Sequence, residues 1–142
     1  MTGGAEKVQA YQGYNSITTG ASNDTIRIAG SGNTINAGGG HNSLYDSGDT
    51  NTIVMPGAGQ GRDDIYGHVL QNGDKFNFTA ALKATSWDGL TSDIGSFLHM
   101  NMSGNDVLIS ISNQANGAQS LVADLHSVGQ VNLAGMLQRS IF

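Results

Sequence analysis

Cysteine is absent from this chain of 142 residues, proline occurs once, and charged residues make up only 12% of it. The lack of cysteine removes the thiol as a nucleophile, although it does not fix the cellular compartment. Few charged residues together with 21 glycines are not typical of a helical bundle. No run of about twenty apolar residues occurs, so the sequence predicts no insertion into a membrane.

The net charge and the positions of the polar residues exclude further classes of function. A net charge of −5 argues against nucleic acid and anionic membranes as partners. The four histidines form no H-E-x-x-H motif, and no G-x-S-x-G motif is present. The adjacent residues Asp63 and Asp64 would point to opposite faces of a strand. The sequence therefore predicts no catalytic residues, and a protein that is not an enzyme.

A short motif of the form [Asn/Asp]-[Ser/Thr]-[Ile/Leu] recurs every nine residues. The five copies are Asn15-Ser16-Ile17, Asp24-Thr25-Ile26, Asn33-Thr34-Ile35, Asn42-Ser43-Leu44 and Asn51-Thr52-Ile53. A sixth copy, Asp63-Asp64-Ile65, follows after a step of twelve residues, with the extra residues in a loop at 56–59. One aliphatic residue per unit contributes only about 1.5 to 3 kcal/mol on burial, so no unit folds alone.

This period predicts an all-β fold, a parallel β-solenoid or β-roll in which each nonapeptide is one strand and one turn. Two nonapeptides then make one coil of eighteen residues. Ile17, Ile35 and Ile53 should stack on one sheet, facing Ile26 and Leu44 on the other. Hydroxyl residues should alternate outward, and the Asn residues should form ladders that hydrogen-bond along the stack without metal.

The copy from Gly59 to Tyr66 resembles the glycine- and aspartate-rich nonapeptide of the RTX (repeats-in-toxin) family, G-G-x-G-x-D-x-U-x. In that family the turns bind Ca²⁺ between successive coils. The resemblance implies calcium as the cofactor, at a few weak sites because most column positions here are neutral amides. The residues that it implies as metal ligands are Asp24, Asn42, Gly59, Gly61 and Asp63.

The nonapeptide period ends at Gly67, and residues 68–142 have a different pattern. Alternation predicts a strand at 73–78, a short helix at 80–84 capped by Thr79, and an antiparallel meander of strands at 97–102, 107–111 and 120–125. With its apolar tail at 131–142, this part resembles the type I secretion target region that follows RTX repeats. We therefore expect a β-roll at 14–67 and a capping and secretion-signal region at 68–142.

Residues 1–13 are expected to be an N-terminal cap or an artificial start. Val8, Tyr11 and Tyr14 would cover the open apolar end of the first coil. Met1-Thr2-Gly3-Gly4 looks like an added start or a cut through a longer glycine-rich chain.

Three functions remain open at this point. The resemblance favours a non-catalytic C-terminal module of a larger secreted bacterial protein, which assists calcium-dependent folding and type I export and has the type I secretion machinery as its partner. The first alternative is an extracellular binding module that recognises a polysaccharide, a cell surface or ice through the flat face of Ser16, Thr34 and Thr52. The second is an accessory module of an attached secreted enzyme.

Overall fold

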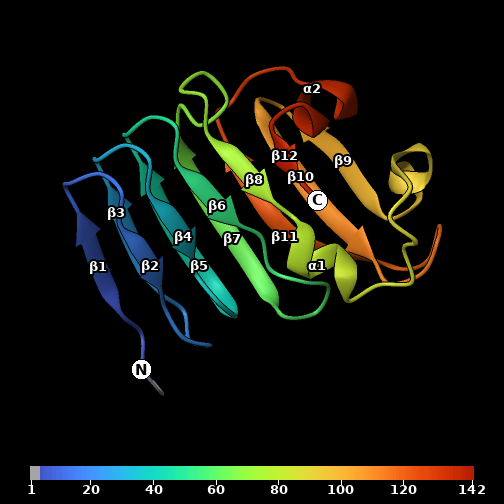
Figure 1. The fold of residues 1–142 in the computed structure, drawn as a ribbon, viewed down its shortest axis with the longest axis horizontal. Helices are drawn as coiled ribbons and strands as arrows, with labels where there is room; N and C mark the ends of the chain where they lie inside the picture. The colour runs from blue at the N-terminus through green and yellow to red at the C-terminus, as the bar shows by residue number, and fades with distance from the viewer. Residues whose placement is uncertain (1–3) are drawn as a thin grey trace.

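Two β-sheets face each other in the computed structural model, which describes residues 4–142 (Figure 1). Sheet A has seven strands, in the order β1 (Lys7–Ala10), β3 (Thr25–Ile28), β5 (Gly40–Asp46), β7 (Gly61–Gly67), β11 (Gln119–His126), β10 (Asp106–Ser112) and β9 (Leu98–Ser103). Sheet B has five, in the order β12 (Ser140–Ile141), β8 (Lys75–Asn77), β6 (Thr52–Val54), β4 (Thr34–Asn36) and β2 (Ser16–Thr18).

From β1 to β8 the chain alternates between the two sheets as it advances, so the strands that follow one another in each sheet are parallel and belong to successive coils. Ser16 pairs with Thr34, and Thr34 pairs with Thr52, at a constant offset of eighteen residues. Thr25 pairs with Ser43 at the same offset on sheet A. The predicted parallel β-solenoid with two nonapeptides per coil is confirmed.

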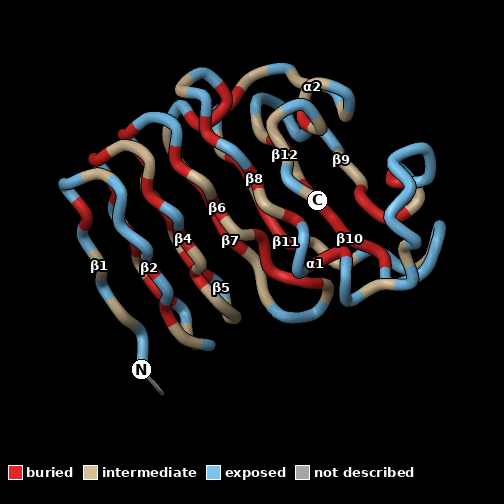
Figure 2. The backbone as a smooth tube through the Cα atoms, viewed as in Figure 1, coloured by how far each residue is buried: buried red, intermediate tan, exposed pale blue. Residues whose placement is uncertain are grey.

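The aliphatic residues of the motif form the two columns that the sequence predicts. Ile17, Ile35 and Ile53 lie in register on sheet B, and Phe76 continues their column. On sheet A, Ile26, Leu44 and Ile65 lie in register and are fully buried, so the sixth copy of the motif keeps its place despite the longer loop before it. Figure 2 shows buried positions alternating with exposed or half-buried ones along these strands.

The first strand corrects the expectation of a separate N-terminal cap. Strand β1 pairs in parallel with β3, and Val8 lies in register with Ile26, so Glu6-Lys7-Val8 is a further half coil. Tyr11 and Tyr14 do not cover the apolar end, because their exposed fractions are 70% and 93%. The sequence signature was missing there because Glu6 and Lys7 replace the usual Asn and Ser or Thr.

The C-terminal part contains the predicted antiparallel meander, β9 to β11. The sequence did not reveal that β11 also pairs in parallel with β7, so that the meander continues sheet A of the solenoid. Between β8 and β9 lie α1 (Thr79–Lys83) and the 3₁₀ helix η1 (Thr91–Ser96). The predicted Thr79 cap is wrong, because Thr79 is already helical and Phe78 at the N-cap position makes no side-chain hydrogen bond.

The apolar tail forms α2 (Leu133–Leu137) and β12, and β12 pairs in parallel with β8 at the end of sheet B. Among residues 4–142, no helix is long and apolar enough to cross a membrane. The expectation of an artificial start concerns residues 1–3, which lie outside the described part of the chain.

Candidate functional site

Three of the residues expected to bind calcium form one buried column beside the core of sheet A. Asp24, Asn42 and Asp63 occupy the same position of successive coils, immediately before the outward-facing residues of β3, β5 and β7. Asn42 accepts the backbone N–H of Asp24 on its Oδ1 (2.9 Å), and its Nδ2 donates to Oδ1 of Asp63 (2.9 Å). The Asn42 oxygen is therefore directed to Asp24, and its nitrogen to Asp63.

The buried carboxylates of this column each keep one oxygen without a hydrogen-bond donor, Oδ2 of Asp24 and Oδ2 of Asp63. Asp63 is fully buried, and burial raises its pKa to about 7 although the Asn42 hydrogen bond lowers it. A buried carboxylate oxygen without a donor favours a bound cation or a proton. Asp24 and Asp63 each offer one carboxylate to a weak calcium site. The Asn42 amide between them offers no oxygen at Asp63, because its oxygen accepts from Asp24 and its nitrogen donates to Asp63.

The corresponding column on sheet B is the predicted asparagine ladder. Asn15 and Asn33 each donate a backbone N–H and a side-chain Nδ2–H to the Oδ1 of the next asparagine, at 2.8 to 3.0 Å. The ladder ends at Asn51, whose backbone N–H donates to Oδ1 of Asp74 (2.7 Å). The predicted hydrogen-bonded ladder of asparagine side chains is therefore present from Asn15 to Asn51.

Asp74 closes this column and was not among the expected ligands. Asp74 is only 1% exposed. Burial raises its pKa to about 7, together with the nearby charges of Asp46 and Asp49. Its Oδ2 also lacks a hydrogen-bond donor. Both oxygens of Asp46 accept from Nδ2 of Asn51, at 3.0 and 3.1 Å. The end of the ladder therefore holds two buried carboxylates, Asp46 with both oxygens on Asn51 and Asp74 with one oxygen that has no donor.

The two expected glycine ligands occupy different environments. Gly61 has φ of +153° and lies against Gly40 of the preceding coil, whose carbonyl oxygen a Cβ at residue 61 would overlap. Gly59 has φ of +75°, and no atom lies near the position of an added Cβ. Close packing between coils alone accounts for glycine at 61, independently of any metal.

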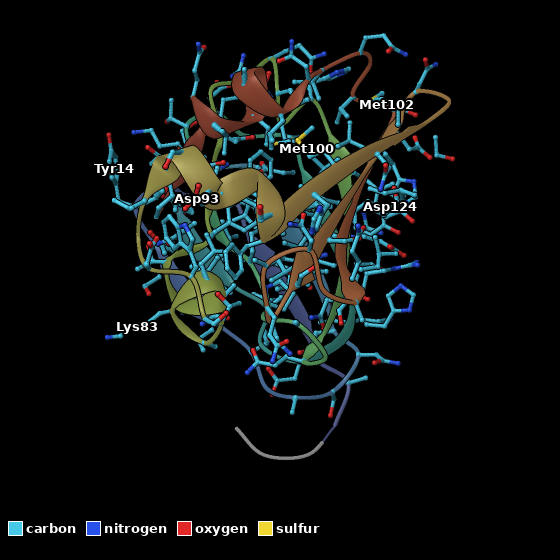
Figure 3. The ribbon with its side chains drawn as sticks, turned by 90° about the vertical axis from the view of Figure 1, so that its right-hand side faces the viewer. Tyr14, Lys83, Asp93, Met100, Met102 and Asp124 are labelled. Carbon is cyan, nitrogen blue, oxygen red and sulfur yellow. The ribbon has the colours of Figure 1, made fainter. Side chains whose placement is uncertain are left out.

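A second polar cluster lies on the outer face of sheet A, where β7 and β11 are neighbours. Figure 3 shows Asp124 on the side of the molecule away from Tyr14 and Lys83. Ligand atoms of Asp64, Asp124 and His126 all lie within 4.8 Å of one another. The cluster was missed because 62 residues separate Asp64 from His126, and only the unpredicted pairing of β11 with β7 brings them together.

Two further side chains hold Asp64 in place. Arg62 donates to Oδ2 of Asp64 at 3.1 Å, and Nε2 of His41 lies 2.8 Å from the same oxygen. Burial raises the pKa of Asp64, but the hydrogen bonds from Arg62 and His41 together outweigh burial and leave the pKa below its ordinary value. Asp64 is therefore an ionised carboxylate at neutral pH.

An aromatic row runs across the same outer face. Tyr45 stacks on Tyr66 with ring centroids 4.8 Å apart, Tyr66 stacks on His126 at 4.3 Å, and Arg27 covers the free face of Tyr45 at 4.4 Å. The signal was present in the sequence, because Arg27, Tyr45 and Tyr66 each follow the aliphatic residue of alternate motif copies. Since the rings cover one another, the row offers ring edges rather than flat faces to a ligand.

The fold defines this chain as a repeat protein of the parallel β-solenoid class, in a form consistent with a β-roll. A scan of protein-family models finds no matching family, and no curated protein matches the sequence.

Proposed function

We propose that this chain is an RTX-like, non-catalytic module of a larger secreted protein, which assists calcium-dependent folding outside the cell and type I export. The observation that carries the proposal is the way in which residues 68–142 complete both sheets of the repeat region. In the RTX-like arrangement that the sequence resembles, the repeats and the export signal lie next to each other at the C-terminal end.

The C-terminal residues are structurally continuous with the coils. Strand β11 extends sheet A from β7, and β8 followed by β12 extends sheet B from β6. Met136 of α2 is fully buried, and the ring of Phe142 stacks on Phe78 with centroids 6.3 Å apart. These contacts support a joint role, in which the segment at the chain end serves as the export signal before folding and as the closing element of the roll afterwards.

Calcium is the cofactor that the residues support. The donor-free oxygens of Asp24, Asp63 and Asp74 would hold calcium at separate positions, with Asp46 adding charge near Asp74. When bound, the ion supplies the positive charge that lets buried carboxylates remain ionised. Because the asparagine ladder joins its coils without carboxylates, we expect the chain to be folded without calcium and to melt at a higher temperature with it.

The export role is tested with a reporter protein fused to the N-terminal side of the chain, in cells that express a type I transporter. The wild-type fusion is expected in the medium, and deletion of residues 131–142 is expected to retain it in the cell. Since that deletion also removes Met136 and Phe142 from the core, a second variant separates folding from export.

The second variant is Asn33→Ala, which breaks the buried ladder but leaves the tail unchanged. Because the type I route of the resembled family carries unfolded chains, this variant should be exported as efficiently as wild type. Equal export of the deletion variant and wild type, or retention of wild type with several transporters, would contradict the proposal.

A second candidate function rests on the outer face of sheet B. Ser16, Thr34 and Thr52 lie in register on neighbouring strands, which spaces their hydroxyls about 4.8 Å apart. Such a row suits a polysaccharide, a cell surface or ice. The variant Thr34→Tyr should abolish retention on the surface concerned without changing the melting temperature, and failure of wild type to bind any tested surface would exclude this function.

A further inference from the structure

We propose that Asp64, Asp124 and His126 form a binding site for a divalent transition metal of the Zn²⁺ kind on the outer face of sheet A. The site is separate from the calcium positions, which lie on the inner columns of the coils. It joins β7, the last strand of the repeats, to β11, the strand by which the C-terminal region extends sheet A.

The distances between the ligand atoms suit a small ion. Nε2 of His126 lies 3.9 Å from Oδ1 of Asp64 and 3.8 Å from Oδ2 of Asp124. Metal bonds of about 2.0 to 2.1 Å in a tetrahedral site imply ligand separations of roughly 3.3 Å. His126 therefore needs to approach each carboxylate by about half an ångström, and the ligand atoms of Asp64 and Asp124, which lie within 4.8 Å, need to approach each other by up to about 1.5 Å, through rotation of the side chains.

The hydrogen-bond state of these atoms points to a missing positive charge. Oδ1 of Asp64, Oδ1 of Asp124 and Nε2 of His126 are buried and have no hydrogen-bond partner. Nη2 of Arg62 lies 2.8 Å from Oδ1 of Asp64, yet the guanidinium directs its hydrogen bond to Oδ2. Two of the three proposed ligand atoms, Oδ1 of Asp64 and Nε2 of His126, are therefore buried without a hydrogen-bond partner, which is costly unless a proton or a cation joins them.

The surroundings of His126 favour a metal over a proton. Its Nδ1 lies 3.4 Å from Oδ2 of Asp106, whose Oδ1 is fixed by the backbone N–H of Ser127 at 2.7 Å. A carboxylate at Nδ1 places the ring proton there and leaves the lone pair on Nε2, as in many carboxylate–histidine–metal arrangements. The stacked ring of Tyr66 fixes the plane of His126. Nε2 is thereby aimed as a ligand at the two carboxylates.

The donor set selects the kind of metal. One imidazole nitrogen and two carboxylates suit Zn²⁺, Ni²⁺ or Cu²⁺, whereas Ca²⁺ prefers oxygen ligands only. The carboxyl groups of Asp64, Asp124 and Asp106 outnumber the single positive charge of Arg62, so a divalent ion balances the local charge. Water would complete the coordination, because the side chain of His126 keeps an exposed fraction of 24%.

The test is a zinc titration of tag-free, metal-stripped protein with saturating Ca²⁺ present, followed by calorimetry and by the imidazole NMR signals of His126. Wild type should bind one Zn²⁺ per chain and shift the His126 signals. His126→Gln and the isosteric Asp124→Asn should each weaken binding about 100-fold, and Asp106→Asn about tenfold, through the positioning of the ring. The matched control His68→Gln, at an exposed histidine that does not belong to the cluster, should bind like wild type.

Three results would overturn the site. They are wild-type protein without zinc binding, zinc binding that shifts only His41, and unchanged affinity in Asp124→Asn. If His126→Gln fails to fold because it loses the stack on Tyr66, Asp124→Asn carries the test, since it keeps the shape of the side chain.

Discussion

Asp63 is a buried carboxyl that makes the stability of this protein depend on pH. Its pKa is raised from 3.8 to about 7 by burial, so between these values the folded protein keeps a proton that the unfolded chain releases. The stabilising contribution of the protonated group is therefore complete below about pH 4 and is lost as the pH rises through about 7. Asp74 acts in the same direction over the same range.

The variant Asp63→Asn keeps the acceptor for Asn42 but cannot ionise. In EDTA at about pH 7.5 we expect it to melt about 3 °C or more above wild type, because each 1 kcal/mol is worth roughly 3 °C in a chain of this size. Its melting temperature should also fall less between about pH 5 and 7.5. Thermal melts followed by circular dichroism over this pH range measure both effects.

If Asp63 binds calcium, the ion should stabilise wild type more than Asp63→Asn, which is the opposite of the difference expected in EDTA. The ion requires the ionised carboxylate, so added Ca²⁺ should raise the melting temperature of wild type more than that of Asp63→Asn. An equal response of the two proteins would remove Asp63 from the calcium ligands and leave Asp24 and Asp74 as the candidates.

Alanine variants of Gly59 and Gly61 distinguish the effect of close packing between coils from the effect of metal binding. Gly61→Ala should destabilise the protein by about 1 to 3 kcal/mol even in EDTA, because the new methyl group meets the carbonyl of Gly40. The matched variant Gly59→Ala has open space and should cost only the strain of a positive φ, about 1 kcal/mol. Urea unfolding compares the two. Equal costs would mean that the contact between the coils relaxes freely.

At the level of the strands, the asparagine ladder connects the coils of β2, β4 and β6 by side-chain hydrogen bonds beside the apolar core. Asn33 makes side-chain hydrogen bonds to both neighbouring coils and to the carbonyl of Gly30. Asn33→Ala leaves several buried polar groups without partners and should cost about 3 kcal/mol. The control Asn15→Ala, at the exposed end of the ladder, should cost under about 1 kcal/mol. A similar urea midpoint for the two variants would contradict a ladder that stabilises the coils.

The elements also show how far the sequence determines the structure. The columns of Ile17 and Ile26 were predictable because a buried position in a narrow core requires an aliphatic side chain in every coil. The outer face carries no such constraint, so the cluster of Asp64 and His126 left no periodic trace. The alternation in β11 predicted a strand but not its partner, since any strand with the same apolar face could pair with β7.

For the molecule as a whole, the tail is the last part of the chain and also the end of sheet B. Deleting residues 131–142 removes β12 from β8 and uncovers Phe78, which contacts Phe142. We expect the truncated protein to melt at a clearly lower temperature and to bind a hydrophobic dye at its newly exposed core. A truncated chain that melts like wild type would show that the coils and β8 suffice for stability.

The offset of eighteen residues between the coils that precede β7 makes this molecule adjustable in length. Each interior coil contacts only the coil before and the coil after it, with the same asparagine and aliphatic positions on both sides. Duplicating residues 25–42 would therefore insert one complete layer of about 4.8 Å without changing the register of any other layer. Evolution or a designer can therefore lengthen or shorten such a chain by whole coils, with little change to the coils that remain.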